Sequence, residues 1–541
     1  MDSVQRMEKP TNDVDTIRSY AAGAPERAAL VEELAALKGR TERVPLIING
    51  QPVFTEHTYD IRCPQDHGLL LAQVSLAGEK EIQQAIVSAL AAQRAWAALD
   101  GEERAAIFLR AADLLAGPRR LENLAAIMLN QSKTVFEAEI DLAELVDFWR
   151  FNVYYMQSLY AQQPDQAPGE HNRFDWRPLE GFILAVPPFN FYSIGGNLAT
   201  APALVGNVAL WKPSRSVALA NYRIMQVLLE AGLPPGVVNF VPFESRHSEI
   251  VLGHPDFAGL HFTGSYETLL ALWQGIARHL GGYRNFPRIV GETGGKDFIM
   301  VHPSADLEAV VANTIRGAFE YQGQKCSAAS RLFAPQSLWP ALRDRLLSEL
   351  AKVKVGPVDD FGVFLGALIS EEAFDKVASY IDHARRHPET YEVLRGGVCD
   401  AAKGWFVSPA LILSNDPEGK LMTEEIFGPV LTVYVYADSD WEETLRLCDR
   451  STPYGLTGAI FAEDREASAQ AEAALRFAAG NFYINDKPTG ATVGRQPFGG
   501  ARRSGTNDKA GSWVNIARWL SPRTVKENLN PTRDWRRPYM K

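Results

Sequence analysis

The chain has 541 residues, of which 46% are hydrophobic and 22% are charged, and its formal net charge is -10. This length predicts two or three domains, because a single hydrophobic core stops growing at roughly 250 to 300 residues. The negative charge argues against a nucleic-acid partner, which would require a basic stripe. Four cysteines without paired spacing indicate a reducing compartment, and no Cys/His cluster has the spacing of a metal site.

The N-terminal segment shows no signal for export or for a membrane. Residues 1–10 contain no apolar core. No apolar run in the chain approaches the roughly 18 residues that cross a bilayer. An organelle presequence is usually poor in acids, whereas this segment contains Asp2, Glu8, Asp13 and Asp15. We therefore expect a cytoplasmic protein with no membrane partner.

Helices dominate the first part of the chain. Residues 1–45 are predicted to form a polar arm that ends in one helix at 26–37. Apolar stripes at helical spacing then run through residues 79–160, and the clearest ones cover 79–99 and 102–115. These helices are interpreted as a packing layer.

From residue 181 the pattern changes to short apolar runs separated by helical stretches such as 217–231. The runs cover 182–186, 208–211, 237–241 and 260–262. This alternation predicts βαβ units and a parallel sheet, which binds ligands beyond the carboxyl ends of its strands. Polar turns follow three of the predicted strands, so the sequence predicts a nucleotide site there: Pro187-Pro-Phe-Asn190, Lys212-Pro-Ser214 and Thr263-Gly-Ser265.

A second α/β region is predicted between residues 294 and 487. Its helices are expected near 307–320 and 371–386, and its strands near 431–435 and 458–461. The basic and aromatic segment 522–541 is expected to pair with 172–179 in an exposed β ribbon that joins subunits.

The strongest chemical signal is Cys326 in the polar loop Tyr321-Gln-Gly-Gln-Lys-Cys326, downstream of Glu292 in a glycine-flanked turn. A thiolate can add to a carbonyl carbon, and a carboxylate can later activate the water that releases the product. The polar neighbours Lys325 and Ser327, with a nearby cation or helix start, are expected to lower the thiol pKa. The three other cysteines are expected to be inert and buried: Cys63, Cys399 and Cys448.

Two weaker sequence motifs each allow two interpretations. Thr263-Gly-Ser265 can present backbone N–H groups to a phosphate, or it can be a plain turn. Asn190 can donate to a developing oxyanion, or it can cap the next helix in an Asx turn. No Gly-x-Gly-x-x-Gly fingerprint occurs in the chain.

An ordered set of motifs resembles the aldehyde dehydrogenase superfamily over residues 45–530. The motifs are the three polar turns above, Glu292-Thr-Gly-Gly-Lys296, Gly323-Gln-Lys-Cys326, Glu424-Glu-Ile-Phe-Gly-Pro-Val430 and Pro497-Phe-Gly-Gly500. The resemblance implies an α/β fold with a Rossmann-type NAD-binding domain, an α/β catalytic domain and a small β-ribbon oligomerisation element. The implied division is an arm at 1–45, an NAD-binding domain at 46–293, a catalytic domain at 294–510 and an oligomerisation segment at 511–541.

Residues 485–491 and 496–511, with Phe189-Asn-Phe191 and Cys326-Ser327, are similar to the subfamily that oxidises L-glutamate γ-semialdehyde to L-glutamate in proline catabolism. This semialdehyde is in equilibrium with 1-pyrroline-5-carboxylate. The similarity implies NAD as cofactor, a homodimer or larger homo-oligomer, and a proline dehydrogenase as a candidate partner. Arg215 follows Ser214 where many NAD-preferring members have glutamate, which leaves NADP open.

The resemblance also implies roles for individual residues. Cys326 corresponds to the nucleophile, Asn190 to an oxyanion donor and Glu292 to the base that activates water. The implied cofactor-binding residues are Pro187, Lys212, Ser214, Gly264, Ser265, Tyr266, Glu425 and Phe427. The implied substrate-binding residues are Ser327, Gly490 and Ala491 for the charged head, Phe191 and Phe498 for the aliphatic chain, and Glu144 near the cysteine.

Three alternative functions have weaker support from the sequence. Within the superfamily, the substrate could be another semialdehyde, such as that of succinate or glutarate. A cysteine hydrolase or thioesterase would need a histidine partner, and none of the ten histidines lies in a recognisable motif. A non-catalytic protein is disfavoured by the joint presence of Cys326, Glu292 and Asn190. A fusion with a proline-oxidising domain is excluded, because no residues remain for one.

Overall fold

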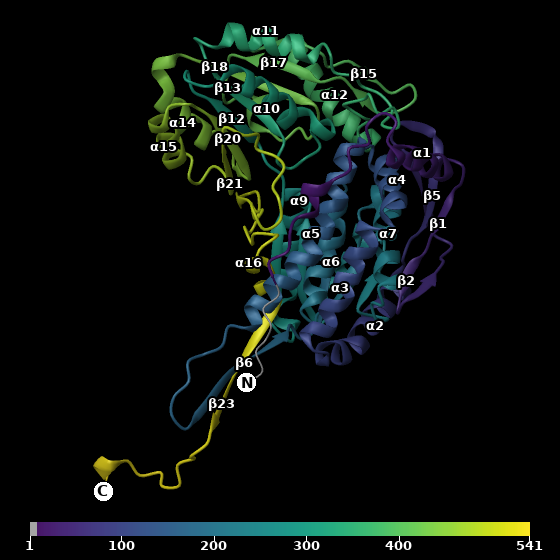
Figure 1. The fold of residues 1–541 in the computed structure, drawn as a ribbon, viewed down its shortest axis with the longest axis vertical. Helices are drawn as coiled ribbons and strands as arrows, with labels where there is room; N and C mark the ends of the chain where they lie inside the picture. Colours follow the sequence, from purple (N-terminus) through teal and green to yellow (C-terminus); the bar gives the residue numbers. More distant parts are fainter. Residues whose placement is uncertain (1–7, 541) are drawn as a thin grey trace.

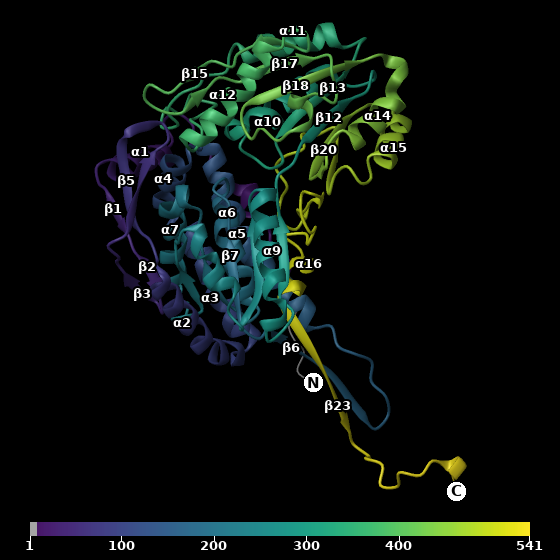
Figure 2. The ribbon, with the colours of Figure 1, turned by 180° about the vertical axis from the view of Figure 1, so that it is seen from behind.

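The computed structural model describes residues 8–540. Two seven-stranded sheets, each covered by helices, form two bodies that meet along the middle of the molecule, and a two-stranded ribbon projects from one side (Figure 1 and Figure 2). The predicted α/β architecture is therefore confirmed. The division at 293/294 stays a prediction, although the strands of the first sheet end at Glu292 and those of the second begin at Asp297.

The first sheet has a parallel centre with two antiparallel strands at one edge. In sheet order it contains β11 (Arg288–Glu292), β10 (Phe257–Thr263), β7 (Phe182–Val186), β8 (Val208–Trp211), β9 (Val238–Phe240), β2 (Leu46–Ile48) and β3 (Gln51–Val53). The predicted strands at 182–186 and 208–211 match β7 and β8 residue for residue. The connecting helices are α6 (Tyr192–Leu204), α7 (Ala218–Glu230), α8 (Ser248–Leu252) and α9 (Tyr266–His279).

A helical layer packs on this sheet, as the periodicity of residues 79–160 predicts. It comprises α2 (Glu79–Ala98), α3 (Gly101–Ala116), α4 (Arg120–Gln131) and α5 (Val135–Tyr160). In α2 the buried side chains recur every three or four residues, which places one apolar stripe against the core: Ile82, Ala85, Ile86, Ala89 and Trp96. No helix in the described part of the chain is both long and apolar enough to cross a bilayer.

The N-terminal region contains more regular structure than the polar arm predicted for it. A short η1 (Asp13–Thr16) precedes α1 (Pro25–Lys38), which agrees with the helix expected at 26–37. A three-stranded sheet that the sequence analysis did not predict follows, with order β1 (Glu42–Val44), β5 (Asp66–Ser75) and β4 (Thr58–Cys63).

The second sheet is parallel except for one edge strand. In sheet order it contains β14 (Tyr391–Arg395), β17 (Ala410–Ser414), β18 (Val430–Tyr436), β13 (Ala329–Pro335), β12 (Asp297–Val301), β20 (Thr457–Phe461) and β21 (Asn481–Ile484). Its principal helices are α10 (Leu307–Phe319), α11 (Trp339–Leu350), α12 (Glu371–Arg386), α14 (Trp441–Arg450) and α15 (Arg465–Ala474). The helices predicted at 307–320 and 371–386 are confirmed.

One cysteine differs from its prediction. Cys63 and Cys448 are buried, whereas Cys399 is exposed in the two-residue strand β15 (Cys399–Asp400). This strand pairs only with β16 (Phe406–Val407) and lies outside the second sheet, so the core does not cover it.

The predicted ribbon forms between distant parts of the chain. β6 (Glu170–Pro178) pairs antiparallel with β23 (Leu520–Asn528) along its whole length, from Glu170 opposite Asn528 to Pro178 opposite Leu520. The ribbon follows α16 (Trp513–Arg518) and extends beyond both bodies, where the C-terminal segment continues away from it (Figure 1).

Candidate active site

A left-handed turn delivers Cys326 to the region between the two sheets. After α10, Tyr321, Gln322 and Gly323 have φ values of 51°, 56° and 65°. A Cβ atom on Gly323 would lie 2.3 Å from the carbonyl oxygen of Gly428, so only glycine fits. Three consecutive residues in this sparsely populated region need strong support from their surroundings.

Buried polar contacts from the end of α4 supply that support. The Gln322 side chain donates to the carbonyl oxygens of Ser132 (3.0 Å) and Ala367 (2.8 Å). The Gln131 side chain donates to the carbonyl oxygen of Phe189 (2.7 Å), directly before Asn190. Segment 131–133 therefore touches both the cysteine turn and the loop after β7.

Lys133 completes this junction with a fully buried charge. Its Nζ lies 2.6 Å from Asp141 Oδ2 and 4.5 Å from the ring centroids of both Phe191 and Tyr321. Asp141 also accepts the backbone N–H groups of Tyr192 (2.7 Å) and Ser193 (2.9 Å) at the start of α6. One ion pair thus fixes α5, the first turn of α6 and the cysteine turn relative to one another.

Cys326 lines two sizeable cavities at once. We call the one of about 490 Å³ at the carboxyl ends of β7, β8 and β10 the sheet-edge cavity. We call the one of about 340 Å³ beside α5 the α5 cavity. Because the same sulfur faces both, a group bound in one cavity can react with a group bound in the other.

The sheet-edge cavity contains all but one of the predicted cofactor residues. Its lining includes Pro187, Lys212, Ser214, Gly264, Ser265, Glu425 and Phe427, together with Asn190. Tyr266 does not line it; its ring packs against the guanidinium of Arg503, 5.0 Å from the centroid. Residues that the sequence analysis missed are Phe189, Glu372, Ala373 and Lys376, and three of these come from α12, whose sequence shows only an ordinary amphipathic helix.

The polar groups of this cavity fit a dinucleotide. Among residues 8–540 the Lys212 ammonium makes no ion pair or hydrogen bond, and burial lowers its pKa. Glu425 Oε1 accepts the Gly295 N–H (3.0 Å), and a Cβ atom on Gly294 would lie 1.8 Å from that oxygen. Ser265 caps α9, whose N-terminus favours a phosphate. The Lys212 ammonium, which lies 5.4 Å from the Phe243 ring centroid and has no ion-pair partner among these residues, suits ribose hydroxyls together with the carboxylate, and the helix N-terminus suits a pyrophosphate.

The α5 cavity contains every predicted substrate residue: Ser327, Gly490, Ala491, Phe191, Phe498 and Glu144. Phe148, Ile194 and Val493 add apolar walls that periodicity alone did not distinguish from core. A charged cluster that was not predicted also faces it: Glu137, Arg316, Glu320, Lys325 and Lys487. Three residues of the N-terminal arm complete the lining: Val14, Asp15 and Ile17.

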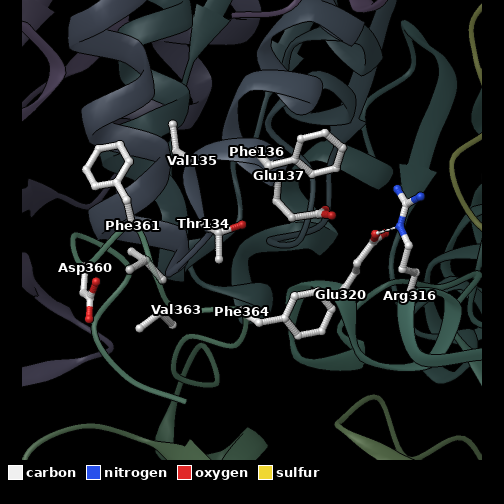
Figure 3. A pocket seen from close by; sticks show the side chains of 11 residues that line it. Thr134, Val135, Phe136, Glu137, Arg316, Glu320, Asp360, Phe361, Val363 and Phe364 are labelled. Carbon is white, nitrogen blue, oxygen red and sulfur yellow. Dashed lines mark hydrogen bonds and ion pairs between the residues drawn. The ribbon is translucent and has the colours of Figure 1, made fainter. Parts of the chain in front are cut away.

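Three residues of this charged cluster, Glu137, Arg316 and Glu320, also line a third cavity of about 370 Å³, which we call the outer cavity (Figure 3). Arg316 pairs with Glu320 at 2.8 Å, and Lys325 Nζ lies 2.9 Å from Glu137 and 3.2 Å from Glu320. Burial opposes the charge of Lys325, but the two carboxylates outweigh it and raise the lysine pKa. Glu137 Oε1 has no hydrogen-bond partner among the described residues.

The reactive groups themselves lie in a desolvated setting. Burial raises the pKa of the Cys326 thiol, and the charges of Asp297, Glu425 and Glu292 raise it further. The predicted lowering of this pKa is therefore wrong: the nearest cation by sequence, Lys325, is committed to two carboxylates. The Ser327 N–H is the one favourable contribution to the thiolate among the main causes.

Glu292 and Asn190 flank the cysteine. Glu292 Oε2 accepts the Gly500 N–H (2.8 Å), and burial raises the pKa of this carboxyl to about 8. Glu292 and Cys326 share a small cavity of about 40 Å³, enough for a water molecule. Asn190 donates one amide hydrogen to the Gln324 carbonyl (3.0 Å), which leaves its second hydrogen for a ligand oxygen.

This arrangement agrees with a family assignment. Residues 53–525 match the model of the aldehyde dehydrogenase family. The chain belongs to the aldehyde dehydrogenase family. A relative from Bos taurus named Delta-1-pyrroline-5-carboxylate dehydrogenase, mitochondrial, is 49% identical over 97% of this chain and 94% of its own length.

Solved structures of family members are similar to this aldehyde dehydrogenase over its whole length. The Delta-pyrroline-5-carboxylate dehydrogenase of Mycobacterium tuberculosis bound with NAD has a TM-score of 0.95 and 47% identity, and each chain is covered completely. Proline utilization A (PutA) from Bdellovibrio bacteriovorus has a TM-score of 0.89 and 28% identity, covering 93% of this chain and 52% of that one.

The comparisons overturn the expected cytoplasmic location. The Bos taurus and Homo sapiens relatives of this aldehyde dehydrogenase, both 49% identical, are named mitochondrial. The expectation was based on the composition of the N-terminal segment and on the missing export signal.

We expect Lys133→Met to destabilise this aldehyde dehydrogenase by about 3–5 kcal/mol, because it leaves the Asp141 charge buried without its cation. The measurement is the free energy of unfolding in urea. Arg62→Met is the control, because the Arg62–Asp60 pair is exposed and such pairs contribute at most about 1 kcal/mol. Equal effects of the two substitutions would contradict the role assigned to Lys133.

Proposed function

We propose that this aldehyde dehydrogenase oxidises L-glutamate γ-semialdehyde to L-glutamate in proline catabolism, with NAD as the cofactor. The observation that carries the proposal is the position of Cys326 between a cavity that fits a dinucleotide and a cavity that fits a short charged aldehyde. The names of relatives that match nearly the whole chain at 47–49% identity support the same substrate.

The lining of the α5 cavity favours an amino-acid aldehyde. The rings of Phe191 and Phe498 suit a short aliphatic chain. The backbone at Gly490, which has φ of 86°, can present N–H groups to a carboxylate. The unpartnered Glu137 Oε1 supplies a negative atom for an ammonium. Succinate semialdehyde carries no ammonium, so it would leave that carboxylate oxygen unpaired.

Each reactive residue of this site has its own role in the proposed reaction. Cys326 Sγ adds to the aldehyde carbon and its proton passes to water in the small cavity beside it, while the free amide hydrogen of Asn190 stabilises the oxyanion of the resulting hemithioacetal. Bound NAD supplies the hydride acceptor that converts this adduct to a thioester. Glu292 then takes a proton from the water in the small shared cavity. That water's oxygen replaces sulfur on the acyl carbon, which releases glutamate and restores the thiol.

The surroundings of Arg215 favour NAD over NADP. Its guanidinium lies 4.5 Å from the ring centroid of Tyr59, so its charge already has a partner. Glu372 also lines the sheet-edge cavity. A hydrogen bond from Ser370, and in smaller part the Arg215 charge, lower the pKa of Glu372 and keep it ionised. Its negative charge would repel a 2′-phosphate.

The ribbon of β6 and β23 is proposed as an oligomerisation element, as its exposed position suggests. It draws its strands from both ends of the folded core, so it forms only once the NAD-binding region and the C-terminal segment are in place. A proline dehydrogenase is proposed as the source of the substrate, and a structural neighbour named proline utilization A (PutA) supports a link to proline breakdown.

Initial rates with each aldehyde and each nicotinamide test the proposed function. Glutamate semialdehyde with NAD should give the highest kcat/KM, and Cys326→Ala should abolish oxidation while NAD affinity is unchanged, because the cofactor groups lie elsewhere. A preference for succinate semialdehyde would remove the proposed substrate. Loss of NAD affinity in Cys326→Ala would contradict the arrangement of the two cavities.

Thioester hydrolysis should depend on pH through Glu292. A carboxyl whose pKa is about 8 is mostly protonated at pH 7 and becomes a base above pH 8. We expect the hydrolysis rate to rise about tenfold between pH 7 and pH 9, and Glu292→Gln to lose this rise while the burst of NADH in the first turnover persists. Disappearance of the burst would show that Glu292 acts before hydride transfer.

Removal of β23 should abolish oligomerisation. A variant ending at residue 519 is expected to sediment as a monomer, because β6 then has no partner strand. A variant ending at residue 530 keeps the ribbon and serves as the control. An unchanged sedimentation coefficient in the shorter variant would place the subunit interface elsewhere.

A further inference from the structure

Residues 8–20 belong to the N-terminal arm and are called the arm from here on. They have no role in the function proposed above, yet two of their side chains are buried. Most of the arm is exposed, whereas Asn12 is 6% exposed and Tyr20 is 3% exposed. Both side chains donate to carboxylates of α5, Asn12 to Asp147 and Tyr20 to Glu139. These carboxylates lie about two turns apart, so the arm runs antiparallel along α5.

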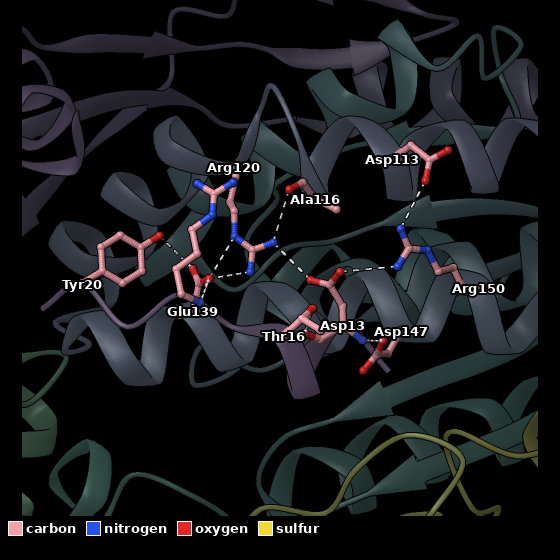
Figure 4. Close-up of polar contacts among 10 residues, drawn as sticks. Asp13, Thr16, Tyr20, Asp113, Ala116, Arg120, Glu139, Asp147 and Arg150 are labelled. Carbon is pink, nitrogen blue, oxygen red and sulfur yellow. Dashed lines mark hydrogen bonds and ion pairs between the residues drawn. The ribbon is translucent and has the colours of Figure 1, made fainter. Parts of the chain in front are cut away.

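A buried ion network holds the arm against that helix (Figure 4). Arg120 is 4% exposed and lies 2.5 Å from Glu139 Oε1 and 3.1 Å from Asp13 Oδ2. Asp13 also pairs with Arg150 (3.4 Å), and its backbone N–H donates to Asp147 (2.6 Å). Breaking a buried pair leaves an uncompensated charge, so these contacts fix the position of the arm.

Asn12 makes a second contact that reaches the substrate site. Its Nδ2 donates to Asp147 Oδ2 (3.1 Å) and to the carbonyl oxygen of Val493 (2.9 Å). Both amide hydrogens are therefore used, one toward α5 and one toward the loop 490–495. Asp15 forms an ion pair with Arg495 at the end of the same loop. The arm thus clamps the loop whose backbone at Gly490 and Ala491 faces the α5 cavity.

The arm also forms part of the cavity wall. Val14, Asp15 and Ile17 line the α5 cavity between the two buried anchors. The neighbouring helix α5 contributes Ile140, Glu144 and Phe148 to the same lining. Without the arm, the loop 490–495 would lose its hydrogen-bonded link to α5 and would keep only the apolar packing of Val493 against Phe148 and Phe151.

We propose that the arm is part of the substrate site, with Asn12 as a positioning residue for the loop 490–495 and with Val14 and Ile17 as its apolar wall. The inference rests on the proposed function, because it assigns the arm to recognition of the charged head of a short α-amino-acid aldehyde. The arm touches neither the sheet-edge cavity nor Glu292. It therefore acts on substrate affinity and leaves the cofactor and the chemical steps unchanged.

Asn12→Ala tests this inference in the full-length protein. We expect the KM for glutamate semialdehyde to rise about tenfold, the equivalent of one or two lost hydrogen bonds, with kcat and NAD affinity unchanged. Thr16→Ala is the matched control, because its hydroxyl bonds only within the arm, to the Asp13 carbonyl (3.1 Å). Asn12→Gln keeps both amide donors and should recover part of the affinity.

The outcomes separate this inference from the proposed function. A wild-type protein that does not oxidise glutamate semialdehyde refutes the proposed function itself. With active wild type, an unchanged KM in Asn12→Ala overturns the role of the arm. If kcat, NAD affinity and melting temperature all fall in Asn12→Ala, the role of the arm is also overturned, because the substitution would then act through the whole structure.

Discussion

The site depends on one buried ion pair. Lys133 has no access to water, so its charge must be balanced inside the protein, and Asp141 and two aromatic rings balance it. Each partner belongs to a different part of the site: α5, the loop that carries Phe191, and the left-handed turn before Cys326. Because a buried charge without its partners is costly, these parts cannot move independently. The neighbouring Gln131 and Ser132 extend the same junction to Phe189, directly before Asn190, and to Gln322.

Burial around this junction also determines the protonation state of the reactive groups. Burial raises the pKa of both Cys326 and Glu292, so the thiol and the carboxyl are largely neutral at pH 7. Lys325 does not activate Cys326, since it is shared between Glu137 and Glu320. The Lys509 charge lowers the pKa of Glu292, but burial outweighs it. Proton removal therefore accompanies the reaction, and a small water-sized cavity between the two groups is the place for it.

The sheet-edge cavity and the α5 cavity are built from different kinds of structural features. The first presents strand ends and a helix N-terminus, which are general features for a dinucleotide. The substrate cavity instead combines α5, the cysteine turn, the loop 490–495 and the N-terminal arm. Its selectivity therefore depends on how four separate segments are held together. Asn12 joins α5 to the loop 490–495 with a single side chain, and this link is the basis of the effect on substrate binding proposed for the arm.

The sequence alone predicted the α/β architecture and many of its helices and strands, and it supplied the candidate reactive groups. Strands such as β7 and β8 were predicted because apolar runs report burial locally, and Cys326, Glu292 and Asn190 because their motifs are short. Lys133, Glu137 and Asn12 were not found, and Tyr266 was placed in a cavity that it does not line. Only the tertiary structure decided these points. A side chain's partner can lie 481 residues away, as Val493 does from Asn12, and no local pattern records which buried polar groups meet.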